Sequence, residues 1–95
     1  MTNLTALELS ALTALVNEGL GCMGGETASD LRDDNMACMF PKEVASALGI
    51  NLQAVGGVMA SLQQKGLTLW DEISDGRDGY WLTDAGIDAA VENNL

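Results

Sequence analysis

The strongest constraint on the fold of this chain is a change of hydrophobic period at Gly66. Before it, apolar residues recur at helical spacing over 41–48 and 52–65, and each segment ends in a glycine. Asn51 suits the cap of the second segment, because its side-chain oxygen can accept a free N–H group of the first turn. After Gly66, apolar and polar residues alternate as in a β-strand. Two helices joined by a short turn, then strands, indicate a helix-turn-helix outline.

Further elements are expected on both sides of this outline. Thr5 and Glu8 have the spacing of a capping box, which predicts a helix that ends at Gly19 and Gly21. Residues 67–73 and 80–82 read as strands separated by turn-forming residues, so we expect a β-hairpin. Thr83 can cap a last helix over about 84–93. The apolar positions expected to face the core from the first helix are Leu9, Leu12, Val16 and Leu20.

Residues 21–40 lack a clear period and predict an irregular acidic loop, with one short helical turn around 28–31. A calcium-binding loop needs alternating oxygen ligands, a central glycine and a terminal glutamate, and the run Asp30, Asp33, Asp34, Asn35 departs from this pattern. Arg32 occupies a ligand position and the glycine is missing, so a solvated acidic loop is favoured over a cation site. Cys22 and Cys38 lie in this stretch without C-x-x-C spacing, and both are expected to be free thiols.

Composition excludes several classes of protein. The 95 residues fit one domain, and no apolar run is long enough to cross a bilayer. The start of the chain lacks the basic residues of a signal peptide, which favours a cytoplasmic location. There is no histidine, no glycine-rich phosphate loop and no cluster of metal ligands. We therefore expect a protein that is not an enzyme and that uses no cofactor or metal.

Two stretches resemble the winged-helix regulators. The segment V-A-S-A-L-G-I, residues 44–50, followed by L-Q-Q-K-G-L, residues 62–67, resembles their second and third helices. The segment Y-W-L-T-D-A-G, residues 80–86, resembles the passage from their second wing strand into the last helix. The resemblance covers residues 41–90 and, more loosely, residues 5–20, and it extends to short phage-encoded winged-helix proteins. The resemblance implies a single winged-helix domain over residues 1–95, mainly α-helical with a small β-hairpin (α+β).

The charge is distributed unevenly along the chain. The net charge is −10, from 14 acidic and 4 basic side chains. Residues 41–66 carry only Lys42, Glu43 and Lys65, a net charge of +1, whereas every other segment is negative. A DNA-binding surface needs cations to neutralise phosphates. The sequence therefore disfavours general DNA binding and leaves two hypotheses of function.

The main hypothesis is a regulatory module that binds a basic protein surface, in the manner of a DNA mimic. An excess of acids that serves only solubility is an equally good account of the charge. The acids of the wing and the loop would steer and pair with the partner, and a tryptophan would be the anchor, or both tryptophans would only cover the core edge. The residues of this hypothetical protein-binding site are Asp71, Glu72, Asp75, Asp78, Asp30, Asp33, Asp34, Trp70 and Trp81.

The alternative hypothesis is a DNA-binding transcription regulator that reads DNA with the helix at 51–65, as a homodimer or with a basic partner. Its contact residues would be Asn51, Gln53, Gly57, Ser61, Gln64 and Lys65. Gly56 and Gly57 lie inside this helix, where each glycine costs about 1 kcal/mol relative to alanine. We expect close packing of another element to account for one of them. The close approach of a partner is left open for the other.

Overall fold

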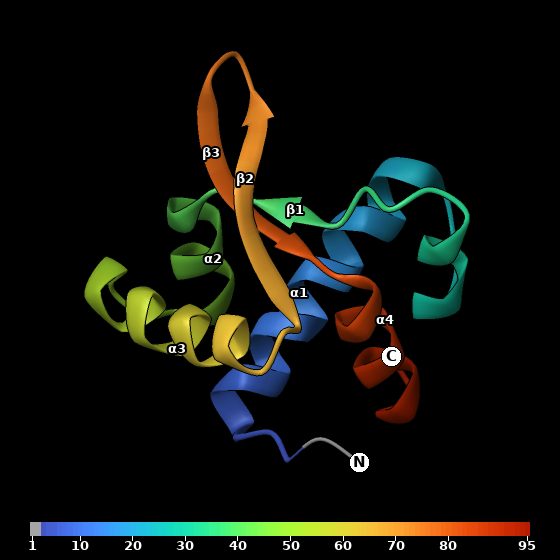
Figure 1. Cartoon of the computed structure of the whole chain (residues 1–95), viewed down its shortest axis with the longest axis horizontal. Helices are drawn as coiled ribbons and strands as arrows, with labels where there is room; N and C mark the ends of the chain where they lie inside the picture. Colours follow the sequence, from blue (N-terminus) through green and yellow to red (C-terminus); the bar gives the residue numbers. More distant parts are fainter. Residues whose placement is uncertain (1–2) are drawn as a thin grey trace.

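The computed structural model of the chain describes residues 3–95, and these form helices arranged around a small sheet (Figure 1). The elements follow the order expected from the sequence, with a mainly α-helical fold and one β-hairpin. Their bounds are α1 Ala6–Met23, the 3-10 helix η1 Ala28–Arg32, β1 Cys38–Met39, α2 Pro41–Leu48, α3 Leu52–Gln64, β2 Thr68–Ser74, β3 Arg77–Leu82 and α4 Asp84–Glu92.

The helix caps expected from the sequence are confirmed. Thr5 and Glu8 form the capping box of α1, with Thr5 Oγ1 accepting from Glu8 N–H at 3.1 Å and Glu8 Oε1 accepting from Thr5 N–H at 2.8 Å. Asn51 Oδ1 accepts the Ala54 N–H at 2.8 Å at the start of α3. Gly49 ends α2 in the left-handed conformation, with φ of 67°, so the chain turns sharply into α3.

The start of α1 is therefore as predicted, but its end is not. The helix continues through Gly19 and Gly21 to Met23 and is closed by Gly24. Gly19 is a position of close packing: an added Cβ would lie 2.7 Å from Leu31 Cδ2 and 3.0 Å from the Ala37 backbone. Leu31 and Ala37, from the expected loop, are fully buried against α1. The segment 24–37 is thus folded onto the core, and the predicted helical turn is η1.

Three strands form an antiparallel sheet in the order β1-β3-β2. The hairpin of β2 and β3 was predicted and projects from the helices as the wing (Figure 1). β1 was not predicted; its two residues pair with Trp81 and Tyr80 of β3. Both backbone groups of Glu72 in β2 are bonded: its N–H donates to Asp71 Oδ1 at 2.7 Å, and its carbonyl accepts from the Trp81 indole at 3.1 Å. Neither group of Glu72 is then free to pair with a strand of another chain.

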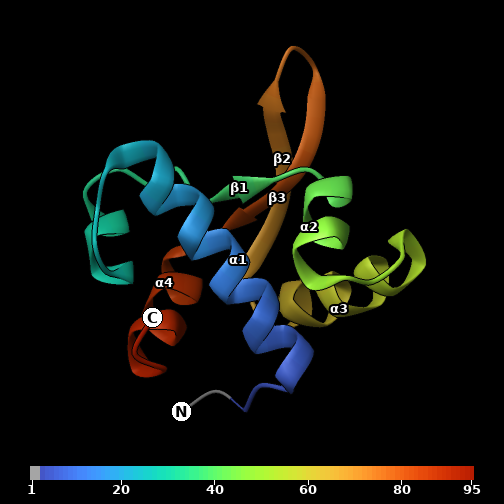
Figure 2. The ribbon, with the colours of Figure 1, turned by 180° about the vertical axis from the view of Figure 1, so that it is seen from behind.

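Helix α1 runs through the middle of the molecule, with α2 and α3 on one side and η1 and α4 on the other (Figure 2). Its buried face is shifted from the expected one. Leu12 and Val16 are buried as predicted, but Ala11 and Leu15 take the places expected for Leu9 and Leu20, which are only partly buried. The core also receives Val44, Val55, Met59, Leu62, Leu82 and Ile87 from the other elements.

Within residues 3–95 no single helix has the length and apolar character of a membrane span. Both cysteines are free thiols. Cys22 is exposed, and burial raises the pKa of Cys38, with smaller contributions from Cys22, Glu18 and Glu43.

Candidate nucleic-acid interface

The outer face of α3 is exposed and has no charged side chain. The buried face of the helix is formed by Val55, Met59 and Leu62. The exposed positions lie on the opposite side. Each of them is a glutamine, an alanine or a glycine. They are Gln53, Gly56, Gly57, Ala60, Gln63 and Gln64, preceded by Asn51 and Leu52. Of the predicted DNA contacts, Asn51, Gln53, Gly57 and Gln64 are brought together on this face.

The two glycines of α3 have no packing role within the described chain. An added Cβ at Gly56 or at Gly57 would meet no atom of another element within 4 Å, and both residues are exposed. The expectation that close packing accounts for one of them is therefore wrong. The glycines leave the helix backbone bare at the centre of the outer face.

Two cations that were not predicted as part of the site, Lys42 and Arg77, lie beside the start of α3. Arg77 of β3 places its Cζ 4.6 Å from the centre of the Phe40 ring. This side chain of the wing therefore contacts the N-cap residue of α2. Arg77 and Lys42 line an open hollow of about 480 Å³, with Phe40, Pro41, Glu43 and Leu52. No sequence spacing links Lys42 to Arg77; the fold of the wing brings them together.

Lys42 and Arg77 are the basic side chains that have no ion pair within residues 3–95. Arg32 Nη1 pairs with Asp88 Oδ1 at 2.6 Å, on the side of α4. Lys65 Nζ pairs with Glu8 Oε1 at 2.8 Å. The hollow is thus lined by two cations without an ion pair in the described chain and by one carboxylate, that of Glu43, and its cations can hold an anionic oxygen such as that of a phosphate.

Two of the predicted DNA contacts, Ser61 and Lys65, are bonded to Glu8 and not free on the outer face. Ser61 Oγ donates to Glu8 Oε2 at 2.7 Å, and Lys65 Nζ donates to Glu8 Oε1. Glu8 is the one charged side chain buried among residues 3–95. Burial raises its pKa, but hydrogen bonds from Lys65, the Thr5 N–H and Ser61, with the charge of Lys65, outweigh burial and lower the pKa to about 2.

The wing acids are exposed, but two of them support the hairpin itself. Asp71 bonds the N–H of Glu72, and Glu72 Oε2 accepts the N–H of Gly76 at 2.8 Å. Asp75 and Asp78 accept no hydrogen bond in the described chain. Asp75 forms the turn with a positive φ of 51°.

The two tryptophans differ in exposure. Trp70 is 46% exposed and meets Tyr80 edge to face, with 4.8 Å between ring centres. Trp81 is half-buried and bonded across the hairpin to Glu72. Trp70 is therefore the more accessible of the two proposed anchors.

The loop acids lie away from the wing. Asp30 Oδ2 accepts from the N–H groups of Glu26 and Thr27, which lowers its pKa and starts η1. Asp33 and Asp34 are exposed at the end of η1. This segment packs beside α4, far from the tip of the hairpin in both views (Figures 1 and 2). The predicted acidic site is thus divided between two parts of the molecule.

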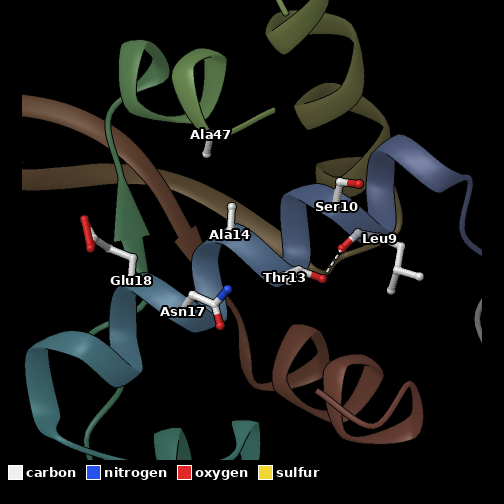
Figure 3. A pocket seen from close by; sticks show the side chains of 7 residues that line it. All are labelled: Leu9, Ser10, Thr13, Ala14, Asn17, Glu18 and Ala47. Carbon is white, nitrogen blue, oxygen red and sulfur yellow. Dashed lines mark hydrogen bonds between the residues drawn. The ribbon is translucent and has the colours of Figure 1, made fainter. Parts of the chain in front are cut away.

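A second open groove, of about 610 Å³, follows α1 (Figure 3). Ala14 of α1 and Ala47 of α2 point toward one another across it. Ser10, Thr13 and Asn17 add small polar groups, and Thr13 Oγ1 is bonded to the Leu9 carbonyl at 2.8 Å. Glu18 is the charged residue of its lining. The groove therefore adds no cation to the site at α3.

Comparison with solved structures shows that the chain has the winged-helix fold. MepR of Staphylococcus aureus, a transcription regulator of the multidrug efflux pump MepA, matches 95% of this chain with a TM-score of 0.69 at 18% identity. BpsR of Bordetella bronchiseptica, whose DNA binding is regulated by 6-hydroxynicotinic acid, matches 96% with a TM-score of 0.63 at 24% identity. hsRosR-S1 matches 95% with a TM-score of 0.58 at 25% identity.

The chain spans about half the length of MepR and BpsR, which it covers to 55% and 53%, and 69% of hsRosR-S1. No protein-family model matches the chain, and neither does a curated protein. The resemblance to phage-encoded members is not tested by these structures and stays a prediction.

Proposed function

We propose that this winged-helix chain is the DNA-binding part of a transcription regulator, which presents the outer face of α3 to the major groove. The observation that carries the proposal is the uncharged, partly bare face of α3 beside the cations Lys42 and Arg77. The function of MepR and the DNA binding of BpsR, both of the same fold, support it. They favour the alternative hypothesis of the sequence analysis over protein binding by an acidic surface.

The face of α3 suits the reading of bases better than the holding of phosphates. An α-helix fits the major groove, and a glutamine amide can pair with an adenine edge through two hydrogen bonds. Gln53 and Gln64 present such amides, and Gly56 and Gly57 let the helix backbone approach the bases closely. Asn51 has its oxygen engaged by Ala54, which leaves its amide N–H groups as donors.

Phosphate contacts then come from Lys42 and Arg77 on one side of the helix. Each neutralised phosphate adds about −0.9 to the slope of log affinity against log salt. Two cations therefore give a slope of roughly −2 for one copy and roughly −4 for a dimer. The net charge of −10 opposes binding further, so a second copy or a basic partner is part of the proposal.

The test is a fluorescence-anisotropy titration with a mixed-sequence duplex at about 50 mM and about 200 mM salt. We expect affinity to fall roughly tenfold for one copy, or roughly a hundredfold for a dimer, over this range. Lys42→Met and Arg77→Met should each reduce the slope by about 0.9 per copy. Arg32→Met is the matched control, because Arg32 is paired with Asp88 away from α3. No binding at the lower salt, or equal slopes for all variants, would contradict the proposal.

The second candidate is binding of a basic protein by the wing, favoured by the exposed carboxylates of Asp75 and Asp78. The variant Asp75→Asn/Asp78→Asn separates the two functions, and asparagine tolerates the positive φ at position 75. If the wing faces DNA, removing these acids raises affinity for the duplex. If it faces a protein, the variant binds a lysine-rich peptide more weakly than the native chain at equal salt. No change in either assay would leave the wing acids without a binding role.

A further inference from the structure

We infer that Glu8 is a positioning residue for DNA binding: its carboxylate clamps the last turn of α3 through Ser61 and Lys65 and so removes Lys65 from the phosphate-binding cations. We name Glu8, Ser61 and Lys65 the Glu8 clamp. The inference rests on the proposed function for its effect on DNA, while the clamp itself is a feature of the fold.

The clamp joins two segments that are far apart in the sequence, residues 3–8 and residues 61–65. Glu8 lies in the first turn of α1, and both its oxygens are engaged: Oε2 accepts from Ser61 Oγ at 2.7 Å, and Oε1 from Lys65 Nζ at 2.8 Å. Oε1 also accepts the Thr5 N–H, and Lys65 Nζ donates to the Asn3 carbonyl at 2.8 Å. The carboxylate is therefore fully paired although it is buried.

The spacing of Ser61 and Lys65 lets the clamp fix the rotation of α3 about its own axis. Residues four apart in a helix lie on the same side, one above the other, so Ser61 and Lys65 face α1 together. Two bonds from one carboxylate to this side fix the rotation of α3 about its axis. Gly57 and Gln53 continue the same row of residues four apart toward the start of the helix, so a fixed rotation also sets the direction in which these exposed residues point. Rotation of the helix would move these residues away from the bases they should meet.

The same bonds keep Lys65 from serving as a phosphate contact. Moving its ammonium to DNA would leave the buried Glu8 carboxylate without its counter-charge, and an unpaired buried charge is strongly unfavourable. Glu8 stays ionised well below neutral pH, because its pKa is lowered to about 2. The clamp is therefore closed at every pH at which the protein would bind DNA.

The experiment measures affinity and salt slope for the mixed-sequence duplex in Lys65→Met, Lys65→Arg, Glu8→Gln and Glu8→Gln/Lys65→Met, with circular dichroism to confirm folding. Methionine keeps the packing of the aliphatic stem of the lysine. We expect Lys65→Met to lower affinity roughly tenfold, the scale of coupling between residues in contact, with the salt slope unchanged. Lys65→Arg should restore affinity. The double variant should bind no more weakly than Lys65→Met alone.

Lys42→Met is the control, because it should lower the slope by about 0.9 per copy. A similar loss of slope in Lys65→Met would identify Lys65 as a phosphate contact and overturn the inference. Additive losses of affinity in the double variant would overturn it too, because they would show that Glu8 and Lys65 act independently.

If the native chain binds no duplex at the lower salt, the proposed function fails and the clamp is tested by hydrogen exchange. Lys65→Met should then speed exchange of amides 58–64 of α3 roughly tenfold, with the amides of β2 and β3 unchanged. Equal acceleration throughout the chain would show a loss of global stability only and would overturn the clamp.

Discussion

At the scale of single residues, two threonines beside the wing have opposite roles. Thr68 of β2 is buried, and its hydroxyl has no hydrogen-bond partner within the described chain. Thr83 lies next to it in space, since its N–H donates to the Leu67 carbonyl. The Thr83 hydroxyl caps α4 by accepting from Gly86 N–H at 2.9 Å and donates to the Gly66 carbonyl at 2.7 Å. One hydroxyl therefore costs free energy and the other stabilises the fold.

Replacing both threonines by valine tests this difference with the same chemical change. Thr68→Val keeps the shape and removes an unsatisfied polar group, so it should raise the free energy of unfolding by about 1 kcal/mol. Thr83→Val removes a helix cap and should lower that free energy by about 1 kcal/mol or more. Urea unfolding followed by circular dichroism measures both. A loss of stability in Thr68→Val would mean that its hydroxyl has a partner after all, such as an ordered water.

At the scale of elements, α3 combines a structural cost with its proposed use. Glycine inside a helix is about 1 kcal/mol less favourable than alanine, and two adjacent glycines lie at the centre of this one. Neither is explained by packing, in contrast to Gly86 of α4, where an added Cβ would lie 2.1 Å from the Leu67 carbonyl oxygen. The cost at Gly56 and Gly57 is consistent with a helix whose backbone must be approached by a partner.

The variant Gly56→Ala/Gly57→Ala should therefore separate stability from binding. Its free energy of unfolding should rise by about 1–2 kcal/mol, because alanine favours the helix and meets no neighbour. Its affinity for duplex DNA should fall, since two methyl groups would hold the helix away from the bases. Gly86→Ala is the contrasting variant and should destabilise the fold. Higher stability with unchanged DNA affinity would show that the glycines do not face the nucleic acid.

The same elements show what the sequence could predict. Helices α2 and α3 and the hairpin are marked by local signals, namely the cap at Asn51, the glycine at 49 and the change of period after Gly66. The end of α1 was mispredicted because Gly19 serves a contact with Leu31 and Ala37, which no local pattern reveals. β1 was missed because its two residues are a strand only through pairing with β3.

The candidate site could likewise be predicted only in part. The exposed amides of α3 follow from helical periodicity, so Gln53 and Gln64 were placed correctly on its outer face. The approach of Arg77 to Lys42 and the burial of Glu8 against Ser61 depend on how distant elements pack. From its position in the sequence, Lys65 was predicted as a DNA contact of the helix, whereas in the structure it forms an ion pair with Glu8.

At the scale of the whole molecule, lowering the pH should change the free energy of unfolding in two opposite ways. Protonation of surface acids relieves the repulsion of a chain with a net charge of −10, which favours the folded state. Protonation of Glu8 has the reverse effect. Its pKa is lowered from 4.5 to about 2 by folding, so its contribution is fully present above pH 4.5 and is lost as pH falls toward 2. That contribution is about 3 kcal/mol, since each pKa unit corresponds to about 1.4 kcal/mol.

Comparison of the native chain with Glu8→Gln isolates the second effect, because all the other acids are common to both proteins. We expect the difference in their free energies of unfolding to be about 3 kcal/mol at pH 6 and to shrink steadily between pH 4.5 and pH 2. Below pH 2 the native glutamic acid becomes uncharged like the glutamine, so the two proteins should approach equal stability. Urea unfolding at several pH values measures this difference. A difference that stays constant over the range would mean that packing of the side chain, and not its ionised carboxylate, holds α3 to α1.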